Sequence, residues 1–172
     1  IEALSAERRL DMIGVVSKAV GFHGMVGGQA LDLAAEHQVV PANALRDIHS
    51  LKTGELISAA AEVGAICGGA TRWQRDALVR FARAIGLAFQ VTDDVLDVTG
   101  DSASLGKTAG KDERAEKSTY VSTLGLGGAQ QEADALLKEA LDALAEFGEA
   151  AEPLRALAVS YTHLTLPTIL PV

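Results

Sequence analysis

The chain has 172 residues, 48% of them hydrophobic and 22% charged, a composition that is ordinary for one globular domain and excludes a disordered acidic protein. The formal net charge is −8, so the chain lacks the basic character expected of a nucleic-acid-binding protein. No apolar run approaches the roughly 18 residues needed to span a bilayer, and no signal peptide opens the chain, so we expect no membrane association. The single Cys67 cannot form an internal disulfide, which favours a cytoplasmic location.

Apolar residues recur at three- and four-residue spacing, and Ala and Leu dominate, so the pattern predicts helices almost everywhere. In chain order, we expect helices over residues 5–36, 41–67, 73–98, 118–126 and 129–147, and a short one from Pro153. Ser5 is a plausible N-cap, and Pro41 suits a first helical turn. A polar loop is expected over 100–117. No strand pattern is visible, and the predicted fold class is therefore all-α, a helical bundle.

Two of the predicted helices contain residues that disfavour a helix. The first helix contains a run of glycines, each costing up to about 1 kcal/mol relative to Ala, which is tolerated where another backbone or a ligand comes close: Gly21, Gly24, Gly27 and Gly28. On the same helix, Gln29 and Asp32 lie one turn apart and share a face. In the second helix, Lys52, Thr53 and Gly54 interrupt an apolar pattern. They indicate a local kink that exposes a carbonyl beside a lysine; a surface lysine is the alternative.

The third helix combines apolar residues on nearly all sides with a cluster of acids, and we expect it to be buried. Successive side chains leave a helix about 100° apart, so four of its polar residues lie within an arc of about 100°: Gln90, Asp93, Asp94 and Asp97. Two carboxylates about 4 Å apart repel each other by roughly 4 kcal/mol at an effective dielectric constant near 20. Three acids on a sheltered face therefore indicate a bound cation, and oxygen ligands suit Mg²⁺. The alternative is an ordinary solvated stripe. A di-iron carboxylate site is excluded, because no histidine has a glutamate three positions before it.

The polar loop resembles a phosphate-binding P-loop at Gly106-Lys107-Thr108, but the match fails. Five residues instead of four separate Gly100 from Gly106, and no strand precedes the loop. A nucleoside triphosphatase is therefore excluded. The remaining interpretation is a flexible loop whose lysines, among them Lys107 and Lys117, fold over a metal-bound diphosphate; an ordinary solvated loop is equally compatible.

The two ends of the chain differ from its middle. The chain begins at Ile1 within a helical pattern, so we expect an N-terminally truncated piece of a longer protein. The last segment, SYTHLTLPTILPV (160–172), contains no Asp, Glu, Lys or Arg, and its two prolines prevent a continuing helix. We expect residues 1–159 to belong to a single helical domain and 160–172 to be a non-native tail, with a natural extended tail as the alternative.

Four segments in order, within residues 24–126, resemble the trans-prenyltransferases of the farnesyl/geranyl diphosphate synthase (polyprenyl synthetase) family: MVGGQALDL, IHSLKTGELI, GLAFQVTDDVLDVTGD and LGKTAGKDERAEKSTY. The resemblance implies an isoprenoid-synthase-type helical bundle whose N-terminal helices are missing here. It implies Mg²⁺-dependent condensation of an allylic diphosphate with isopentenyl diphosphate, and a homodimer. Isopentenyl diphosphate and the allylic diphosphate are thus the expected substrates.

The resemblance also implies roles for individual residues. Mg²⁺ would be bound by the DDxxD aspartates, Asp93, Asp94 and Asp97. The departing diphosphate would be held by three lysines, Lys52, Lys107 and Lys117. Thr53 and Gln90 would line the catalytic allylic site, and Gln29 and Asp32 are similar to polar residues of the family's central cavity, near the diphosphate.

Some family features are absent from this sequence. The first aspartate-rich motif and the basic residues of the isopentenyl diphosphate pocket would precede Ile1, so we expect the chain by itself to be inactive. The compact loop and the KSTY ending favour a short-chain product, of the farnesyl or geranyl type. A longer-chain polyprenyl synthase and a non-catalytic helical partner subunit are the alternatives.

Overall fold

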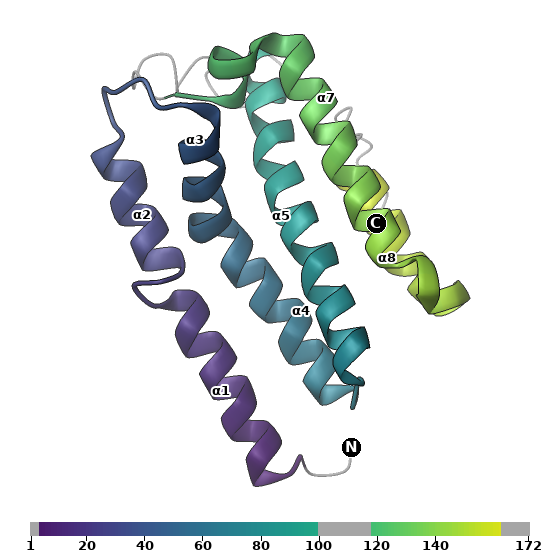
Figure 1. The fold of residues 1–172 in the computed structure, drawn as a ribbon. Coiled ribbons are helices and arrows are strands. Elements are labelled where there is room, and N and C mark those ends of the chain that lie inside the picture. The colour runs from purple at the N-terminus through teal and green to yellow at the C-terminus, as the bar shows by residue number, and fades with distance from the viewer. Residues whose placement is uncertain (1–3, 100–117, 163–172) are drawn as a thin grey trace, which may run out of the picture.

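The computed structural model describes residues 4–99 and 118–162, and nearly all of them are helical, as predicted. The helices are α1 (Ala6–Val20), α2 (Met25–Ala34), α3 (Ala42–His49), the π-helical turn η1 (Ser50–Gly54), α4 (Glu55–Cys67), α5 (Arg72–Thr99), α7 (Tyr120–Ala143), the 3₁₀ turn η2 (Ala145–Ala151) and α8 (Glu152–Thr162). They run side by side, with α1 and α2 along one edge, α3 and α4 next to them, α5 in the middle, and α7 and α8 beyond it (Figure 1). None of the described helices is long and apolar enough to cross a bilayer.

The predicted helix over residues 5–36 is two helices, so this expectation is wrong in one respect. Ser5 caps α1 as predicted, because its Oγ accepts the N–H of Arg8 at 3.3 Å. The helix then ends at Gly21, which adopts an extended conformation while its N–H bonds the carbonyl of Lys18. The glycine run therefore breaks the helix as well as allowing close approach.

The predicted helix from Pro41 to Cys67 is confirmed, and the irregularity expected in it is present. Ser50–Gly54 form one π-helical turn between α3 and α4, and the N–H of Glu55 bonds the carbonyl of Ser50, five residues earlier. Such single π turns are frequent at functional sites. This turn contains Lys52 and Thr53, two of the predicted site residues.

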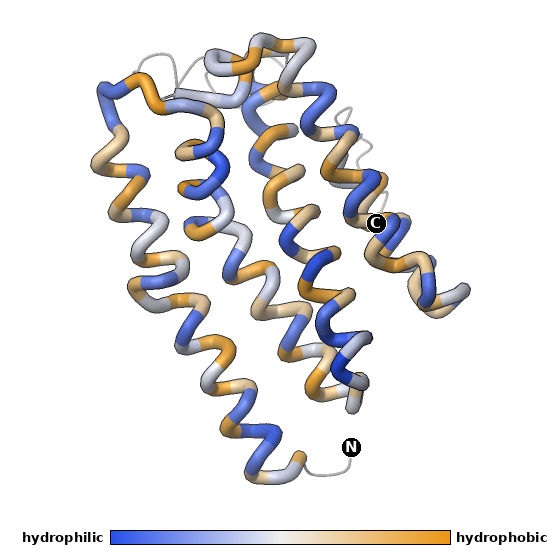
Figure 2. Tube along the Cα trace, viewed as in Figure 1, coloured by the Kyte–Doolittle hydropathy of each residue, from blue (hydrophilic) through white to orange (hydrophobic). Residues whose placement is uncertain are grey.

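Helix α5 packs against α4 on one side and α7 on the other and forms the centre of the core. As expected from its apolar residues, many of its side chains are buried, with Ala88 and Val91 fully inaccessible. Figure 2 shows apolar and polar segments alternating along each helix, as in a bundle whose helices each bury one stripe. By contrast, several apolar side chains on α1, on α2 and in the turn between them are exposed, among them Leu10, Ile13, Val16, Phe22 and Val26.

The fourth and fifth predicted helices are joined in α7, and the predicted division lies close to a kink inside it. Gly125 has φ 74° and ψ 163°, a conformation that favours glycine. The last helix begins at Glu152, next to the predicted Pro153, and continues to Thr162, so the first residues of the predicted tail are helical. The rest of that tail, residues 163–172, lies outside the described residues.

Candidate functional site

A glycine in α2 allows the π turn to pack directly on that helix. A Cβ atom on Gly28 would lie 2.2 Å from the backbone nitrogen of Lys52 and 2.7 Å from the carbonyl carbon of Leu51. On the other side of the turn, a Cβ on Gly86 of α5 would lie 3.1 Å from the Cα of Gly54. The prediction that a backbone comes close to the glycine run is thus confirmed at Gly28. The π turn is held between α2 and α5, each of which presents a glycine to it.

This packing brings together residues from two of the sequence motifs. The Nζ of Lys52 lies 2.7 Å from Oδ2 of Asp32, and their side chains are 33% and 15% exposed. A half-buried ion pair of this kind keeps both charges hydrogen-bonded while leaving the lysine accessible. Gln29, predicted to share this face, is exposed, and Thr53 is half-buried in the π turn.

Gln90 on α5 is connected to the same region through a residue that the sequence analysis missed. The Nδ1 atom of His49 lies 3.0 Å from Oε1 of Gln90. His49 is the last residue of α3 and directly precedes the π turn. Its ring also stacks on Tyr120 of α7, with ring centroids 5.7 Å apart and an interplanar angle of 25°.

The three aspartates of the DDxxD motif in α5 differ in environment, so the expectation of one sheltered face is wrong. Asp94 is 9% exposed, and its Oδ2 accepts the backbone N–H of Tyr120 at 2.6 Å. Asp93 is exposed, and Asp97 is half-buried. The arc of about 100° therefore extends from the interface with α7 out to solvent, and one of the three carboxylates anchors the start of α7.

The fit of Mg²⁺ to these residues depends on Asp93 and Asp97. Across the described residues, no group of three or more His, Cys, Asp or Glu side chains is gathered so as to hold a metal ion. Asp93 and Asp97 are, however, one helical turn apart, and neither carboxylate has a hydrogen bond or ion pair to another described residue. Mg²⁺ in proteins commonly takes one or two carboxylates and fills its remaining positions with water and substrate phosphate. Two carboxylates of this kind fit that coordination.

Lys107 and Lys117, the other predicted ligands of the diphosphate, lie outside the described residues.

Tyr120, which connects His49 and Asp94, has a buried hydroxyl group with no hydrogen-bond partner within the described part of the chain. Burial raises the pKa of this phenol well above its ordinary value near 10. Between pH 9 and pH 11 the phenol of the unfolded chain loses its proton while the folded one retains it, so the folded state loses stability as pH rises.

The Tyr120→Phe variant tests this environment. Because the hydroxyl makes no hydrogen bond to the described residues, we expect the variant to be as stable as the parent at pH 7, within about 1 kcal/mol. Between pH 9 and pH 11, urea unfolding should show the parent losing about 1 kcal/mol more than the variant. Equal losses in the two proteins would contradict the assigned environment of this phenol.

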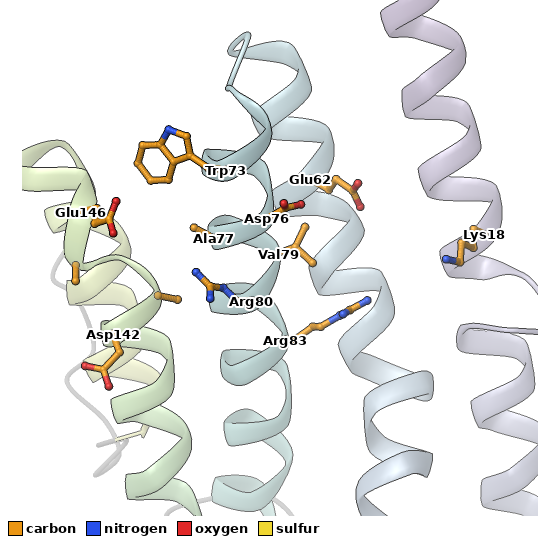
Figure 3. A pocket seen from close by; sticks show the side chains of 12 residues that line it. Lys18, Glu62, Trp73, Asp76, Ala77, Val79, Arg80, Arg83, Asp142 and Glu146 are labelled. Carbon is orange, nitrogen blue, oxygen red and sulfur yellow. The ribbon is translucent and has the colours of Figure 1, made fainter.

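Of the hollows in the described part of the chain, two are lined by Trp, Phe or Tyr side chains. The larger, of about 750 Å³, runs along the first half of α5 and is lined by charged and aromatic side chains that include Trp73, Arg80, Arg83, Asp142 and Glu146 (Figure 3). The side chains of Arg80 and Arg83 extend from opposite sides of α5. The smaller is an apolar cavity of about 320 Å³ between α4, α5 and α8, where Phe89 meets the ring of Tyr161 edge to face. Neither hollow is lined by a predicted diphosphate or metal ligand.

Comparison with known proteins identifies the family. A sequence model of the polyprenyl synthetase family matches residues 1–157. The chain is 47% identical over 147 residues to farnesyl diphosphate synthase of Escherichia coli (strain K12), covering 85% of this chain and 49% of the relative. It is 45% identical over 166 residues to a dimethylallyltranstransferase of Fischerella ambigua (strain UTEX 1903), covering 94% of this chain and 48% of the relative.

The fold leads to the same family. A crystal structure of a geranyltransferase from Helicobacter pylori, complexed with magnesium and isoprenyl diphosphate, matches with a TM-score of 0.72 and 33% identity, covering 92% of this chain and 50% of that one. The chain thus spans about half the length of the relatives that it matches. Its sequence and its all-helical fold show that it belongs to the polyprenyl synthetase family.

Proposed function

We propose that the protein is a prenyltransferase that condenses an allylic diphosphate with isopentenyl diphosphate, and that this chain holds the allylic diphosphate. The observation that carries the proposal is the packing of the π turn against both α2 and α5. This packing places Lys52 on Asp32 and brings Gln90 to His49, next to the turn. The relatives named farnesyl diphosphate synthase and dimethylallyltranstransferase support the reaction class and a short-chain product.

Each predicted residue has a chemical task in this proposal. Lys52 donates hydrogen bonds to the diphosphate, together with Lys107 and Lys117, and so stabilises the negative charge that develops as the C–O bond breaks. The carbonyl of Thr53 and the amide of Gln90 face the allylic carbons. Asp32 and Gln29 complete the polar wall around the diphosphate.

Asp93 and Asp97 would hold Mg²⁺, with Asp94 acting through water. When bound, Mg²⁺ neutralises charge on the departing diphosphate. The crystal structure of the Helicobacter pylori geranyltransferase, which contains magnesium and isoprenyl diphosphate, supports Mg²⁺ as the metal. We also propose a cytoplasmic homodimer, and the exposed apolar side chains of α1 and α2 support a subunit interface on this edge.

Calorimetry with Mg²⁺ and geranyl diphosphate tests the metal assignment. We expect the Asp93→Asn/Asp97→Asn double variant to bind geranyl diphosphate at least about tenfold more weakly than the parent, since even outer-shell changes at metal sites cost about 10–100-fold. Asp76→Asn is the matched control, because Asp76 is an exposed aspartate near the other end of α5. Equal affinities in the double variant and the control would contradict the proposed site.

A chimera tests the reaction itself. The chain contains one aspartate-rich motif, so we expect no prenyl product from the chain alone with Mg²⁺ and both diphosphates. When residues 1–157 replace the homologous segment of the Escherichia coli farnesyl diphosphate synthase, we expect farnesyl diphosphate to form, as measured by chromatography of the products. A folded chimera that binds geranyl diphosphate but forms no product would instead favour a non-catalytic partner subunit.

A further inference from the structure

Lys52 is fixed to α2 at two points. Its backbone nitrogen packs on Gly28, where a Cβ atom would lie 2.2 Å from it, and its Nζ lies 2.7 Å from Oδ2 of Asp32. Gly28 and Asp32 are four residues apart in α2, so they share a face and lie about 6 Å apart along the helix axis. The side chain of Lys52 therefore runs along α2 from Gly28 toward Asp32, and contacts at both ends set the direction of its ammonium group.

Helix formation alone gives no reason for an aspartate at position 32. Asp32 lies in the last turn of α2, where Asp is a weak helix former and the negative end of the helix dipole disfavours an anion. The same end of the dipole favours a cation, but α2 has no basic residue in its last turn. Lys52 of the neighbouring π turn supplies that cation. The ion pair thus compensates for the charge of Asp32 and places the ammonium group where a cation is favoured.

The ion pair also limits what Asp32 can do in the site. A carboxylate and a diphosphate are both anions and repel each other, so Asp32 cannot attract the diphosphate by itself. The ammonium group of Lys52 has three N–H donors and uses one of them on Asp32. The described residues accept no hydrogen bond from the other two, and the Lys52 side chain is 33% exposed. Lys52 therefore offers donors to an anion while Asp32 holds it.

We infer that Asp32 is a positioning residue that acts through Lys52, because it holds the ammonium group along α2 before the allylic diphosphate binds. The inference rests on the proposed function, in which Lys52 binds that diphosphate. A lysine without a partner samples many rotamers, and ordering it when a ligand binds lowers the affinity. In a merely structural role the ion pair would only join the π turn to α2, and removing Asp32 would affect binding equally with and without Lys52.

A double-mutant cycle separates these roles. Calorimetry gives the affinity for geranyl diphosphate in the presence of Mg²⁺ for the parent, Asp32→Ala, Lys52→Met and the double variant. We expect Asp32→Ala to bind about three- to tenfold more weakly than the parent. In the Lys52→Met background the same substitution should change the affinity by less than about twofold, because no ammonium group remains to be positioned.

Two further variants serve as controls. Asp32→Asn keeps an oxygen acceptor for the ammonium group, so its affinity should lie within about twofold of the parent. Glu132→Ala removes another ion pair of 2.7 Å between two helices, the one with Arg46, and should leave the affinity unchanged.

Two results of the cycle would overturn the inference. An equal loss of affinity from Asp32→Ala in both backgrounds would show that Asp32 acts without Lys52, for example as a metal ligand. Tighter binding by Asp32→Ala would show that the carboxylate only competes with the diphosphate for the ammonium group.

Nuclear magnetic resonance of the ¹⁵N-labelled chain tests the position of the ammonium group without a ligand. At low temperature the Lys52 ammonium signal, assigned with Lys52→Met, should exchange with water more slowly than that of the exposed Lys18. Exchange as fast as that of Lys18 overturns the inference, even if Asp32→Ala does not fold. If the parent does not bind geranyl diphosphate, the proposed function fails, and this signal alone decides whether Asp32 holds Lys52. If Lys52→Met lowers the affinity but the Lys52 signal resembles that of Lys18, only the inference about Asp32 fails.

Discussion

Gly28→Ala is expected to lower the free energy of unfolding by about 2–3 kcal/mol or more. The added Cβ would lie 2.2 Å from the backbone nitrogen of Lys52, and a backbone atom cannot move aside as the end of a flexible side chain can. Helix α2 must therefore separate from the π turn, and the ion pair between Lys52 and Asp32 should be lost with it. Urea unfolding followed by circular dichroism measures the change.

Gly14→Ala is the matched control for this prediction. Gly14 lies inside α1, and a Cβ there would have no atom within 4 Å. Alanine is the better helix former, so this variant should be more stable than the parent by up to about 1 kcal/mol. Similar losses of stability in the two variants would contradict the close packing of Gly28 on the π turn.

Asp94→Ala is expected to lower the free energy of unfolding by about 2 kcal/mol in buffer without divalent ions. The substitution removes the acceptor of the Tyr120 N–H, and a buried N–H without a partner costs about 1–3 kcal/mol. It also removes a negative charge from the beginning of α7, where the helix dipole favours one. Thermal or urea unfolding in the presence of a chelator measures the effect.

Asp93→Ala provides the comparison within the same motif. Asp93 is exposed, and its carboxylate has no hydrogen bond or ion pair to the described residues, so its removal should change stability by less than about 0.5 kcal/mol. Its effect should instead be on the binding of Mg²⁺ and geranyl diphosphate. Two variants with the same loss of stability would show that the aspartates are equivalent, contrary to the structure.

The helices could be predicted because their causes are local. The spacing of apolar residues indicated the helices, Ser5 was recognised as a cap, and the Lys52-Thr53-Gly54 sequence indicated the irregularity that is a π turn. The end of α1 at Gly21 was not predicted, because a glycine run both weakens a helix and permits close approach. Sequence alone does not show which of the two effects a given glycine has.

The candidate site could be predicted only in part, because some of its contacts join distant segments. The helical arc groups Gln90 with the aspartates, but the burial of one aspartate, Asp94, depends on where α7 begins. His49 carries no spacing signal, since its partners Gln90 and Tyr120 lie on other helices. The local clue to His49 is its position: it directly precedes the interruption in the predicted helix and lies three residues before Lys52.

The ion pair between Lys52 and Asp32 has a consequence for selectivity among anions. Because the ammonium group already has a carboxylate partner at 2.7 Å, an incoming anion has to compete with Asp32 for it. Chloride or another singly charged ion gains little from such an exchange, whereas a polyanion accompanied by a divalent cation gains more. We therefore expect a singly charged anion to displace Asp32 from Lys52 less readily than a metal-bound diphosphate does.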